Sequence, residues 1–128
     1  MSSSSPNNII ILGSGATGGY LAQELSIENN VTLIDKDISK INQLKNKNSI
    51  MAISGDAADL KTFNEIDLNS INFFIACTDD DQLNLLIAMY FERIPGIQTV
   101  VVLKESKYKD YPGRLGFPEI KTFYPGDI

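Results

Sequence analysis

The sequence predicts an α/β fold in which a doubly wound parallel β-sheet of about six strands carries helices on both faces. Three observations support this prediction. Short, β-branched apolar runs alternate with longer amphipathic stretches along the 128 residues. The runs are continuously apolar, which is typical of strands covered on both faces. The length corresponds to one domain, and the composition, 43% hydrophobic and 21% charged, is that of a globular protein.

Six runs have the composition of strands and are bounded by turn residues. The first is closed by Gly13 and the second by Asp35. We expect the strands at residues 9–12, 31–34, 50–53, 72–77, 99–103 and, as a short sixth strand, 121–124. The Ser-rich residues 1–7 are expected to form a disordered tail in front of a single domain at 8–128.

The stretches between the runs place apolar residues at helical spacing. We expect helices at residues 17–28, 38–47, 56–63 and 80–93. Residues 83–91 are apolar nearly all round, whereas a surface helix needs one apolar stripe. This helix should therefore be buried on a second side, either by a partner subunit or by the chain's own segment after Pro95.

The first predicted strand runs directly into a G-x-G-x-x-G motif, Gly13-Ser14-Gly15-Ala16-Thr17-Gly18. In such a motif the first glycine allows a tight turn, the second lets the backbone approach a pyrophosphate, and the third lets the helix pack closely on the sheet. Free N–H groups at residues 14–17 and the helix dipole would face the phosphate charge. The motif makes the predicted fold Rossmann-like, with strand order 3-2-1-4-5-6.

An acidic residue, Asp35, ends the second predicted strand 22 residues after Gly13. This is the place for a carboxylate that accepts hydrogen bonds from ribose hydroxyls. A 2′-phosphate would be repelled there, so NAD(H) is favoured over NADP(H), although Lys36 would soften the preference. The alternative is that Asp35 only caps the helix that begins at Ile38.

The ends of the third and fourth predicted strands also carry polar residues. Asp56 could receive an adenine amino group, with Gly55 giving room, or it could be a helix N-cap. Thr78 and Asp79 follow the fourth strand, at the edge where ligands bind in such sheets.

Three further residues near this edge have more ordinary interpretations. Asp80 and Asp81 are expected to place negative charge at a helix N-terminus. A divalent cation there would need ligands from elsewhere in the chain. Cys77 is the type of residue that is most often a buried small hydrophobe.

Composition excludes several classes of protein. The net charge of −5 argues against nucleic acid as a partner. One Cys and no His exclude a disulfide and a Cys/His zinc site within one chain, and remove the commonest general base. The longest purely apolar run has seven residues, against about 20 for a membrane span. The start lacks a signal-peptide pattern, so we expect a cytoplasmic protein without membrane insertion.

Four segments together resemble the TrkA-N family, the nucleotide-binding N-terminal domains of potassium-uptake regulators, also called RCK N-domains. They are residues 10–19, 33–37, 55–57 (Gly-Asp-Ala) and 76–84, which hold a Thr-Asp-x-Asp-x-x-Asn block. The resemblance implies that residues 13–18 cradle a pyrophosphate, that Asp35 binds the adenosine ribose, and that Asp56 and Ala57 flank adenine. It also implies that Thr78 and Asp79 border the second nucleoside or its phosphates, with Lys104 near the phosphates.

The resemblance further implies NAD or NADH as the ligand, or alternatively ATP, ADP or AMP. It implies a homodimer or higher homo-oligomer at the inner face of the membrane, docked on a potassium channel or transporter subunit. Family members carry a further C-terminal ligand-binding domain, which this sequence is expected to lack. The residues expected to contact the nucleotide are Gly13, Ser14, Gly15, Ala16, Thr17, Gly18, Asp35, Lys36, Gly55, Asp56, Ala57, Cys77, Thr78, Asp79 and Lys104.

The function expected from these features is that of a regulatory dinucleotide-binding domain that senses nucleotide and gates a membrane channel or transporter. The alternatives are the cofactor-binding fragment of an NAD-dependent oxidoreductase and an adenine-nucleotide sensor of the same fold. No catalytic residue and no metal ligand are expected. No His can polarise a carbonyl group, and none of the five Tyr residues has a Lys four positions on.

Overall fold

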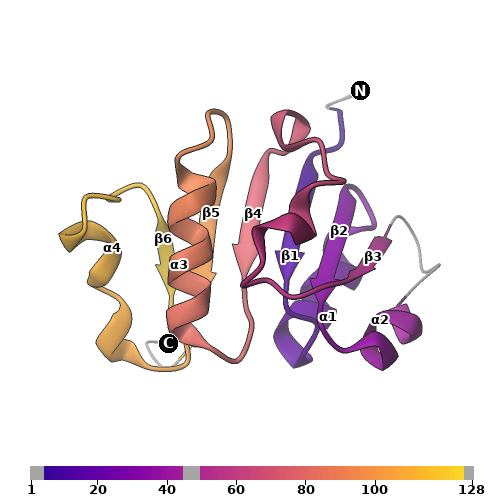
Figure 1. The fold of residues 1–128 in the computed structure, drawn as a ribbon, viewed down its shortest axis with the longest axis horizontal. Coiled ribbons are helices and arrows are strands. Elements are labelled where there is room, and N and C mark those ends of the chain that lie inside the picture. Colours follow the sequence, from indigo (N-terminus) through magenta and orange to yellow (C-terminus); the bar gives the residue numbers. More distant parts are fainter. Residues whose placement is uncertain (1–4, 45–49, 126–128) are drawn as a thin grey trace.

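The computed structural model describes residues 5–44 and 50–125 of the protein. Within them, a six-stranded, all-parallel sheet has the order β3-β2-β1-β4-β5-β6, so the predicted fold class and strand order are confirmed (Figure 1). The strands are β1 (Asn8–Leu12), β2 (Asn30–Asp35), β3 (Ile50–Ser54), β4 (Phe73–Ala76), β5 (Gln98–Val102) and β6 (Lys121–Phe123). The helices are α1 (Ala16–Leu25), α2 (Ile38–Leu44), α3 (Asp81–Glu92) and α4 (Tyr111–Arg114), with short 3₁₀ helices η1 (Leu60–Phe63), η2 (Leu68–Ser70) and η3 (Ser106–Tyr108).

The register of the central strands brings their carboxyl ends level at one edge. Leu12, the last residue of β1, lies opposite Ile34 of β2 and Ala76 of β4. The loops that follow these three strands therefore leave the sheet side by side. In doubly wound sheets, this edge is where ligands bind.

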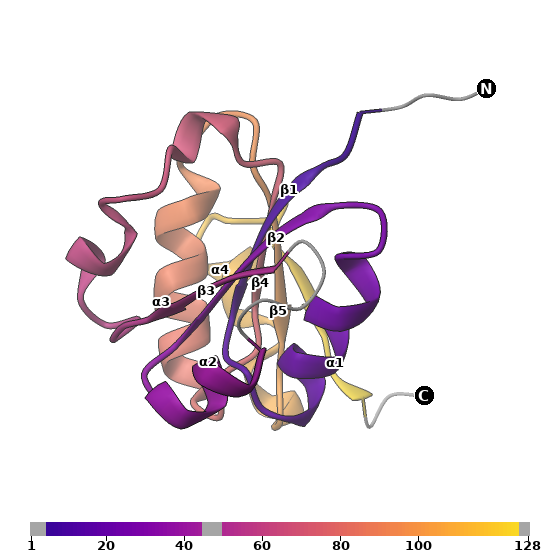
Figure 2. The ribbon, with the colours of Figure 1, turned by 90° about the vertical axis from the view of Figure 1, so that its right-hand side faces the viewer.

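Two apolar layers cover the sheet, and α1 and α3 lie on opposite faces (Figure 2). On the α3 face, the ring of Phe91 stacks on that of Phe74 with centroids 4.0 Å apart, and Phe63 meets Phe91 edge-on at 5.1 Å. These contacts join α3, β4 and η1 through side chains that are almost wholly buried. On the other face, the buried Ala22 and Leu44 bring α1 and α2 against β1–β3.

The predicted helix at residues 56–63 is wrong: the structure has a turn there, followed by the short η1. The side chain of Asp56 accepts the N–H of Ala58, and that of Asp59 accepts the N–H of Lys61. Aspartate side chains that bind the backbone two residues on compete with helical hydrogen bonding. The predicted N-cap role therefore belongs to Asp59, not to Asp56.

The other helices differ from prediction mainly at their ends. Helix α1 ends at Leu25. The carbonyl of Leu25 accepts hydrogen bonds from the backbone N–H and from the side-chain amide of Asn29. For the predicted helix 38–47, residues 45–47 lie outside the described part of the chain. Helix α3 agrees with prediction within one residue at each end. Most of the predicted tail 1–7 also lies outside the described residues, whereas Asn7 is hydrogen-bonded to Asn29 and Asn30.

The chain's own segment after Pro95 covers one flank of α3. Tyr108 and Phe117 pack against the cluster that contains α3, and the side-chain amide of Gln82 donates to the Tyr108 hydroxyl at 2.9 Å. The outermost residues of the helix, Leu86 and Tyr90, are 59% and 40% exposed. The segment after Pro95 therefore buries one flank of α3, as one of the two alternatives predicted, but it leaves Leu86 and Tyr90 exposed.

Candidate nucleotide-binding site

The glycine-rich loop is held between the ends of β2 and β4. The N–H of Gly13 donates to the carbonyl of Ile34 at 2.8 Å. Gly13 has φ +100°, and a Cβ there would lie 2.7 Å from the carbonyl oxygen of Cys77. Only glycine fits this turn without strain, which agrees with the role predicted for it.

The third glycine of the motif lets α1 approach the loop. A Cβ on Gly18 would lie 1.7 Å from the carbonyl oxygen of Gly13, a distance that no side chain can occupy. A Cβ on Gly15, in contrast, would meet nothing within 4 Å. Protein packing therefore does not require glycine at position 15. The absence of a side chain there leaves the space beside the loop open.

Helix α1 begins without a cap from the protein. Gly15 is its N-cap residue and provides no side-chain hydrogen bond. The N–H groups of Gly15, Ala16 and Thr17 have no acceptor among the residues that the structure describes. The prediction of a free N–H at Ser14 is wrong, because this group donates to Asp35 Oδ2 at 2.7 Å. Three unpaired donors and the positive end of the helix dipole remain for an anion.

Asp35 lies directly beside the loop. Its Oδ2 accepts both the N–H and the hydroxyl of Ser14, each at 2.7 Å, and its Oδ1 accepts the N–H of Asp37 at 2.8 Å. Burial alone would raise the pKa of Asp35, but these hydrogen bonds outweigh burial and hold the pKa below its ordinary value. Asp35 is therefore a carboxylate at neutral pH. The cap of α2 is Asp37, which accepts the N–H and hydroxyl of Ser39.

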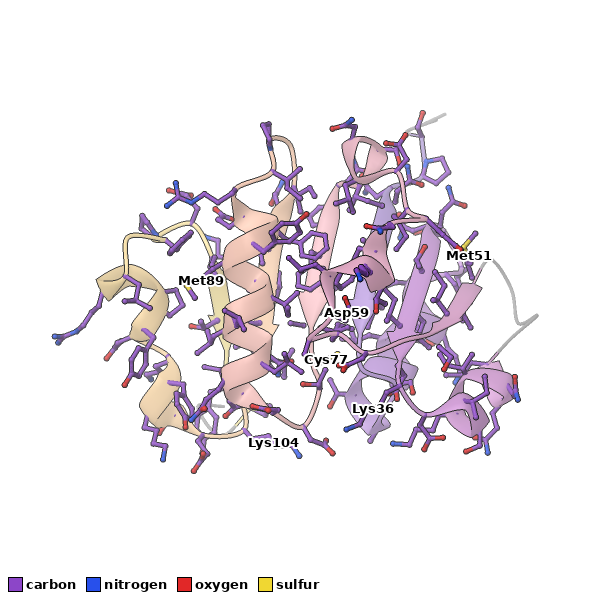
Figure 3. All side chains as sticks on the ribbon, viewed as in Figure 1. Lys36, Met51, Asp59, Cys77, Met89 and Lys104 are labelled. Atoms are coloured by element: carbon purple, nitrogen blue, oxygen red, sulfur yellow. The ribbon has the colours of Figure 1, made fainter. Side chains whose placement is uncertain are left out.

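Ten of the predicted residues line one cavity of about 260 Å³ at the carboxyl edge of the sheet. They are Gly13, Gly15, Asp35, Lys36, Gly55, Asp56, Ala57, Cys77, Thr78 and Asp79. Figure 3 shows Lys36, Cys77 and Lys104 toward the same end of the sheet. Six further residues line the cavity and were not among the predicted contacts: Leu12, Ile34, Asp37, Lys40, Asp80 and Leu83. Lys40 and Leu83 each lie in the first turn of a helix that follows a motif residue.

The third strand ends in a turn whose glycine is needed for protein packing. A Cβ on Gly55 would lie 2.5 Å from Cγ2 of Thr62, so the room expected at Gly55 is taken by a threonine. Asp56 is exposed and lines the cavity, while its Oδ1 accepts the N–H of Ala58 at 2.9 Å. Ala57 is buried in the core on the α3 face.

The β4–α3 loop is fixed by Asn84, which is fully buried in α3. Its Oδ1 accepts the N–H and the hydroxyl of Thr78, at 3.1 and 2.6 Å, and its Nδ2 donates to the carbonyl of Thr78 at 3.1 Å. The Thr-Asp-x-Asp-x-x-Asn block thus forms a closed hydrogen-bonded unit at the wall of the cavity. Asp80 caps α3 by accepting the N–H of Leu83, in agreement with prediction.

A second cavity of about 280 Å³ lies on the other side of the end of β4. Thr17, Cys77, Thr78, Val102, Leu103, Lys104, Tyr124 and Pro125 line it. Lys104 therefore belongs to the second cavity rather than to the first, and its Nζ forms an ion pair with Asp79 Oδ1 at 3.1 Å. Both side chains are largely exposed, so this ion pair contributes little to stability.

Cys77 lies between the two cavities. Its Sγ is 3.8 Å from the carbonyl oxygen of Gly13, and burial raises the pKa of the thiol to about 12. The residue is thus a neutral, half-buried thiol, close to the small hydrophobe that was predicted.

Two properties of the described residues bear on the class of site. In residues 5–44 and 50–125, no three acidic or Cys side chains are grouped so that they could hold a metal ion. None of the helices in these same ranges combines the length and the apolarity needed to cross a bilayer.

A parallel sheet whose first strand leads through a glycine turn to an uncapped helix, with an acid at the end of the second strand, defines a Rossmann-like domain. The particular family follows from the sequence. Residues 9–122 match the TrkA-N domain, and the chain belongs to this family.

A curated relative, the Trk system potassium uptake protein TrkA homolog of Archaeoglobus fulgidus, is 29% identical over 104 residues. The match covers 81% of this chain and 24% of that relative, so the chain spans about a quarter of the relative's length.

Solved structures share the fold. The NAD(P)-binding domain of an exopolyphosphatase-related protein from Archaeoglobus fulgidus has a TM-score of 0.77 and 24% identity, and the match covers 93% of this chain and 88% of that domain. The Shewanella denitrificans Kef CTD in AMP-bound form has a TM-score of 0.73 and 19% identity, with 91% and 71% covered. The GsuK channel bound to NAD has a TM-score of 0.73 and 14% identity, with 94% and 22% covered.

Proposed function

We propose that this chain is the regulatory nucleotide-binding domain of a potassium transport system, and that its ligand is NAD or NADH. The observation that supports the proposal best is the uncapped start of α1, which opens beside the Asp35 carboxylate. The unpaired N–H groups of residues 15–17 would hold the pyrophosphate, and Asp35 would accept ribose hydroxyls.

The remaining contacts follow from the two cavities. The first cavity would take adenosine, with Asp56 and Ala57 at the adenine. The second cavity, on the far side of Cys77 and Thr78, would take the other nucleoside, with Lys104 at its rim. Five acidic residues and two lysines line the first cavity, so the net negative charge disfavours a 2′-phosphate. They are Asp35, Asp37, Asp56, Asp79 and Asp80, against Lys36 and Lys40.

An adenine mononucleotide is the second candidate. The two cavities share only Cys77 and Thr78 among their lining residues, so a mononucleotide could fill the first without the second. The Kef domain that shares this fold carries AMP, whereas the GsuK channel carries NAD. Binding of a ligand that differs in affinity for two conformations would be enough to pass a signal to a transport protein.

The partner in this proposal is a membrane potassium channel or transporter, with the domain at its cytoplasmic side. The names of the TrkA relative and of the GsuK channel support this kind of partner. The exposed Leu86 and Tyr90 of α3 are consistent with assembly into a homo-oligomer. No hydride transfer is proposed, because the chain has no His to act on a carbonyl substrate.

Isothermal titration calorimetry with NAD⁺, NADH, AMP, ADP, ATP and NADPH tests the proposal. We expect NAD⁺ or NADH to bind most tightly and NADPH to bind weakly. Asp35→Ala should weaken binding by about 1–3 kcal/mol, because a ribose hydroxyl loses its acceptor. Absence of binding by every nucleotide would overturn the proposal.

Gly15→Val should abolish binding while the domain stays folded, because the new side chain enters the open space beside the loop. Gly113→Val is the matched control. A Cβ at Gly113 also meets nothing within 4 Å, but the residue lies in α4, away from both cavities. Normal nucleotide affinity in Gly15→Val would show that the loop is not the phosphate site.

A further inference from the structure

The carboxylate of Asp35 is nearly saturated with hydrogen-bond donors. An ionised carboxylate has about four acceptor positions, two on each oxygen. Both positions on Oδ2 are taken by Ser14, one by its N–H and one by its hydroxyl. On Oδ1, the N–H of Asp37 takes one position. Counting the donors of residues 5–44 and 50–125, one acceptor position remains for a ligand, and it is on Oδ1.

A ribose carries two neighbouring hydroxyls, which bind a carboxylate best when each donates to a different oxygen. Asp35 cannot accept both while the Ser14 hydroxyl stays on Oδ2. From this we infer that Ser14 is a specificity-determining residue, whose hydroxyl competes with one ribose hydroxyl for Asp35 Oδ2. The inference rests on the proposed function, since it concerns how the same site recognises the ribose.

The Ser14 hydroxyl is the donor of the three that can leave. The N–H of Ser14 is fixed by the turn at Gly13, which is itself bonded to the carbonyl of Ile34. The N–H of Asp37 is fixed at the start of α2. The hydroxyl needs only a rotation about the Cα–Cβ bond to leave Oδ2. Ser14 is 8% exposed, so water does little to replace the hydrogen bond that the hydroxyl gives up.

The competition has a definite consequence for affinity. In the wild type, one ribose hydroxyl merely exchanges its bond with water for a bond that Ser14 must give up, so its net contribution is small. In Ser14→Ala, Oδ2 has a vacant position and this hydroxyl gains a full hydrogen bond. We expect ligands with an intact ribose to bind Ser14→Ala about three- to tenfold more tightly than they bind the wild type.

The experiment is a thermodynamic cycle in which the Ser14 hydroxyl is removed from the protein and one ribose hydroxyl is removed from the ligand. The dissociation constants of NAD⁺, AMP, 2′-deoxy-AMP and 3′-deoxy-AMP are measured by calorimetry, or by competition with NAD⁺, for the wild type and Ser14→Ala. NAD⁺ and AMP should bind the variant more tightly. One of the two deoxy analogues should bind both proteins equally, because it lacks the competing hydroxyl.

Ser39→Ala is the matched control. It removes a hydroxyl that donates to a neighbouring aspartate, Asp37 Oδ1, at the same 2.7 Å, but leaves Asp35 unchanged. The dissociation constants of the four ligands for Ser39→Ala should equal those for the wild type. Circular dichroism checks that each variant is folded.

The outcomes separate the inference from the proposed function. Equal or weaker binding of NAD⁺ and AMP by Ser14→Ala would overturn the inference alone, because the hydroxyl would then be neutral or would itself bind the ligand. An equal change for all four ligands would also overturn it, since the change would not involve a ribose hydroxyl. Absence of binding to both proteins would overturn the proposed function, and the inference with it.

Discussion

The carboxylate of Asp81 accepts the backbone N–H of Lys104, with N–O distances of 2.9 and 3.1 Å to its two oxygens. Asp81 also accepts the N–H of Glu105 at 2.9 Å. These bonds tie the first turn of α3 to the chain that leaves β5, in a side chain that is 6% exposed. The role expected for Asp81, negative charge at a helix N-terminus, is thus accompanied by a tertiary one.

Replacing Asp81 with alanine should lower the free energy of unfolding by about 2–4 kcal/mol, because two backbone N–H groups lose their acceptor. The neighbouring Asp80→Ala is the control. It removes a single N-cap bond to Leu83 and should lower the free energy of unfolding by about 1 kcal/mol. Urea unfolding followed by circular dichroism measures both. Equal losses in unfolding free energy for the two variants would show that the tertiary hydrogen bonds of Asp81 do not contribute to stability.

Replacement by alanine should affect stability very differently at the two glycines at the start of α1. Gly18→Ala should destabilise the domain strongly, because the new Cβ collides with the carbonyl of Gly13. Gly15→Ala should leave the melting temperature within a few degrees of the wild type, since its Cβ meets no atom within 4 Å. Thermal unfolding distinguishes them. A Gly18→Ala protein as stable as the wild type would contradict the close packing of α1 on the loop.

Acid should remove the stabilising contribution of Asp35. Its pKa is lowered in the folded state despite burial, because Asp37 and Ser14 donate hydrogen bonds to it. A lowered pKa means that the contribution is fully present above the ordinary value of 3.8 and is lost as the pH falls through the folded-state pKa. The difference in unfolding free energy between the wild type and Asp35→Asn should therefore be largest near neutral pH and shrink below pH 3.8.

Asp37→Asn is the comparison for this pH series. The pKa of Asp37 is also lowered, mainly by the hydroxyl of Ser39 and by the backbone of Lys40 and Ser39. Its effect should fade in the same range of pH. A difference between wild type and Asp35→Asn that stays constant from neutral pH to well below pH 3.8 would contradict the lowered pKa.

The single thiol should be unreactive in the folded protein. Burial raises the pKa of Cys77 to about 12, so very little thiolate exists at pH 8. Alkylation by iodoacetamide should be on the order of a hundredfold slower in the native protein than in urea. Because Cys77 is the one cysteine of the chain, the mass of the protein reports on it directly. Similar rates in both conditions would contradict its burial.

The sequence was sufficient to predict the sheet, because its strands are continuous apolar runs and the glycine motif fixes where β1 ends. The prediction failed at residues 56–63, where Asp56 and Asp59 favour turns that a helical spacing of apolar residues does not reveal. Within the site, residues that act through the local chain were predictable. Contacts that depend on how distant loops meet were not, as the two bonds between Ser14 and Asp35 show.

The same reason explains two of the residues missed at the first cavity. Lys40 and Leu83 line it because α2 and α3 begin over the carboxyl edge of the sheet. The sequence places both residues in a first helical turn, but the spacing alone does not say which side chains of that turn face the cavity. Lys104, which was expected near the phosphates, lines the second cavity and forms an ion pair with Asp79, and its predicted contact with the nucleotide stays a prediction.

The end of β4 has a consequence for how such a domain can be altered. Cys77 and Thr78 form a partition that both cavities share, and Asn84 holds Thr78 with three hydrogen bonds, two to its main chain and one to its hydroxyl. The side chain that holds this dividing wall, Asn84, belongs to α3 and lines neither chamber. Substitutions at residues that line only one chamber should therefore leave the dividing wall in place.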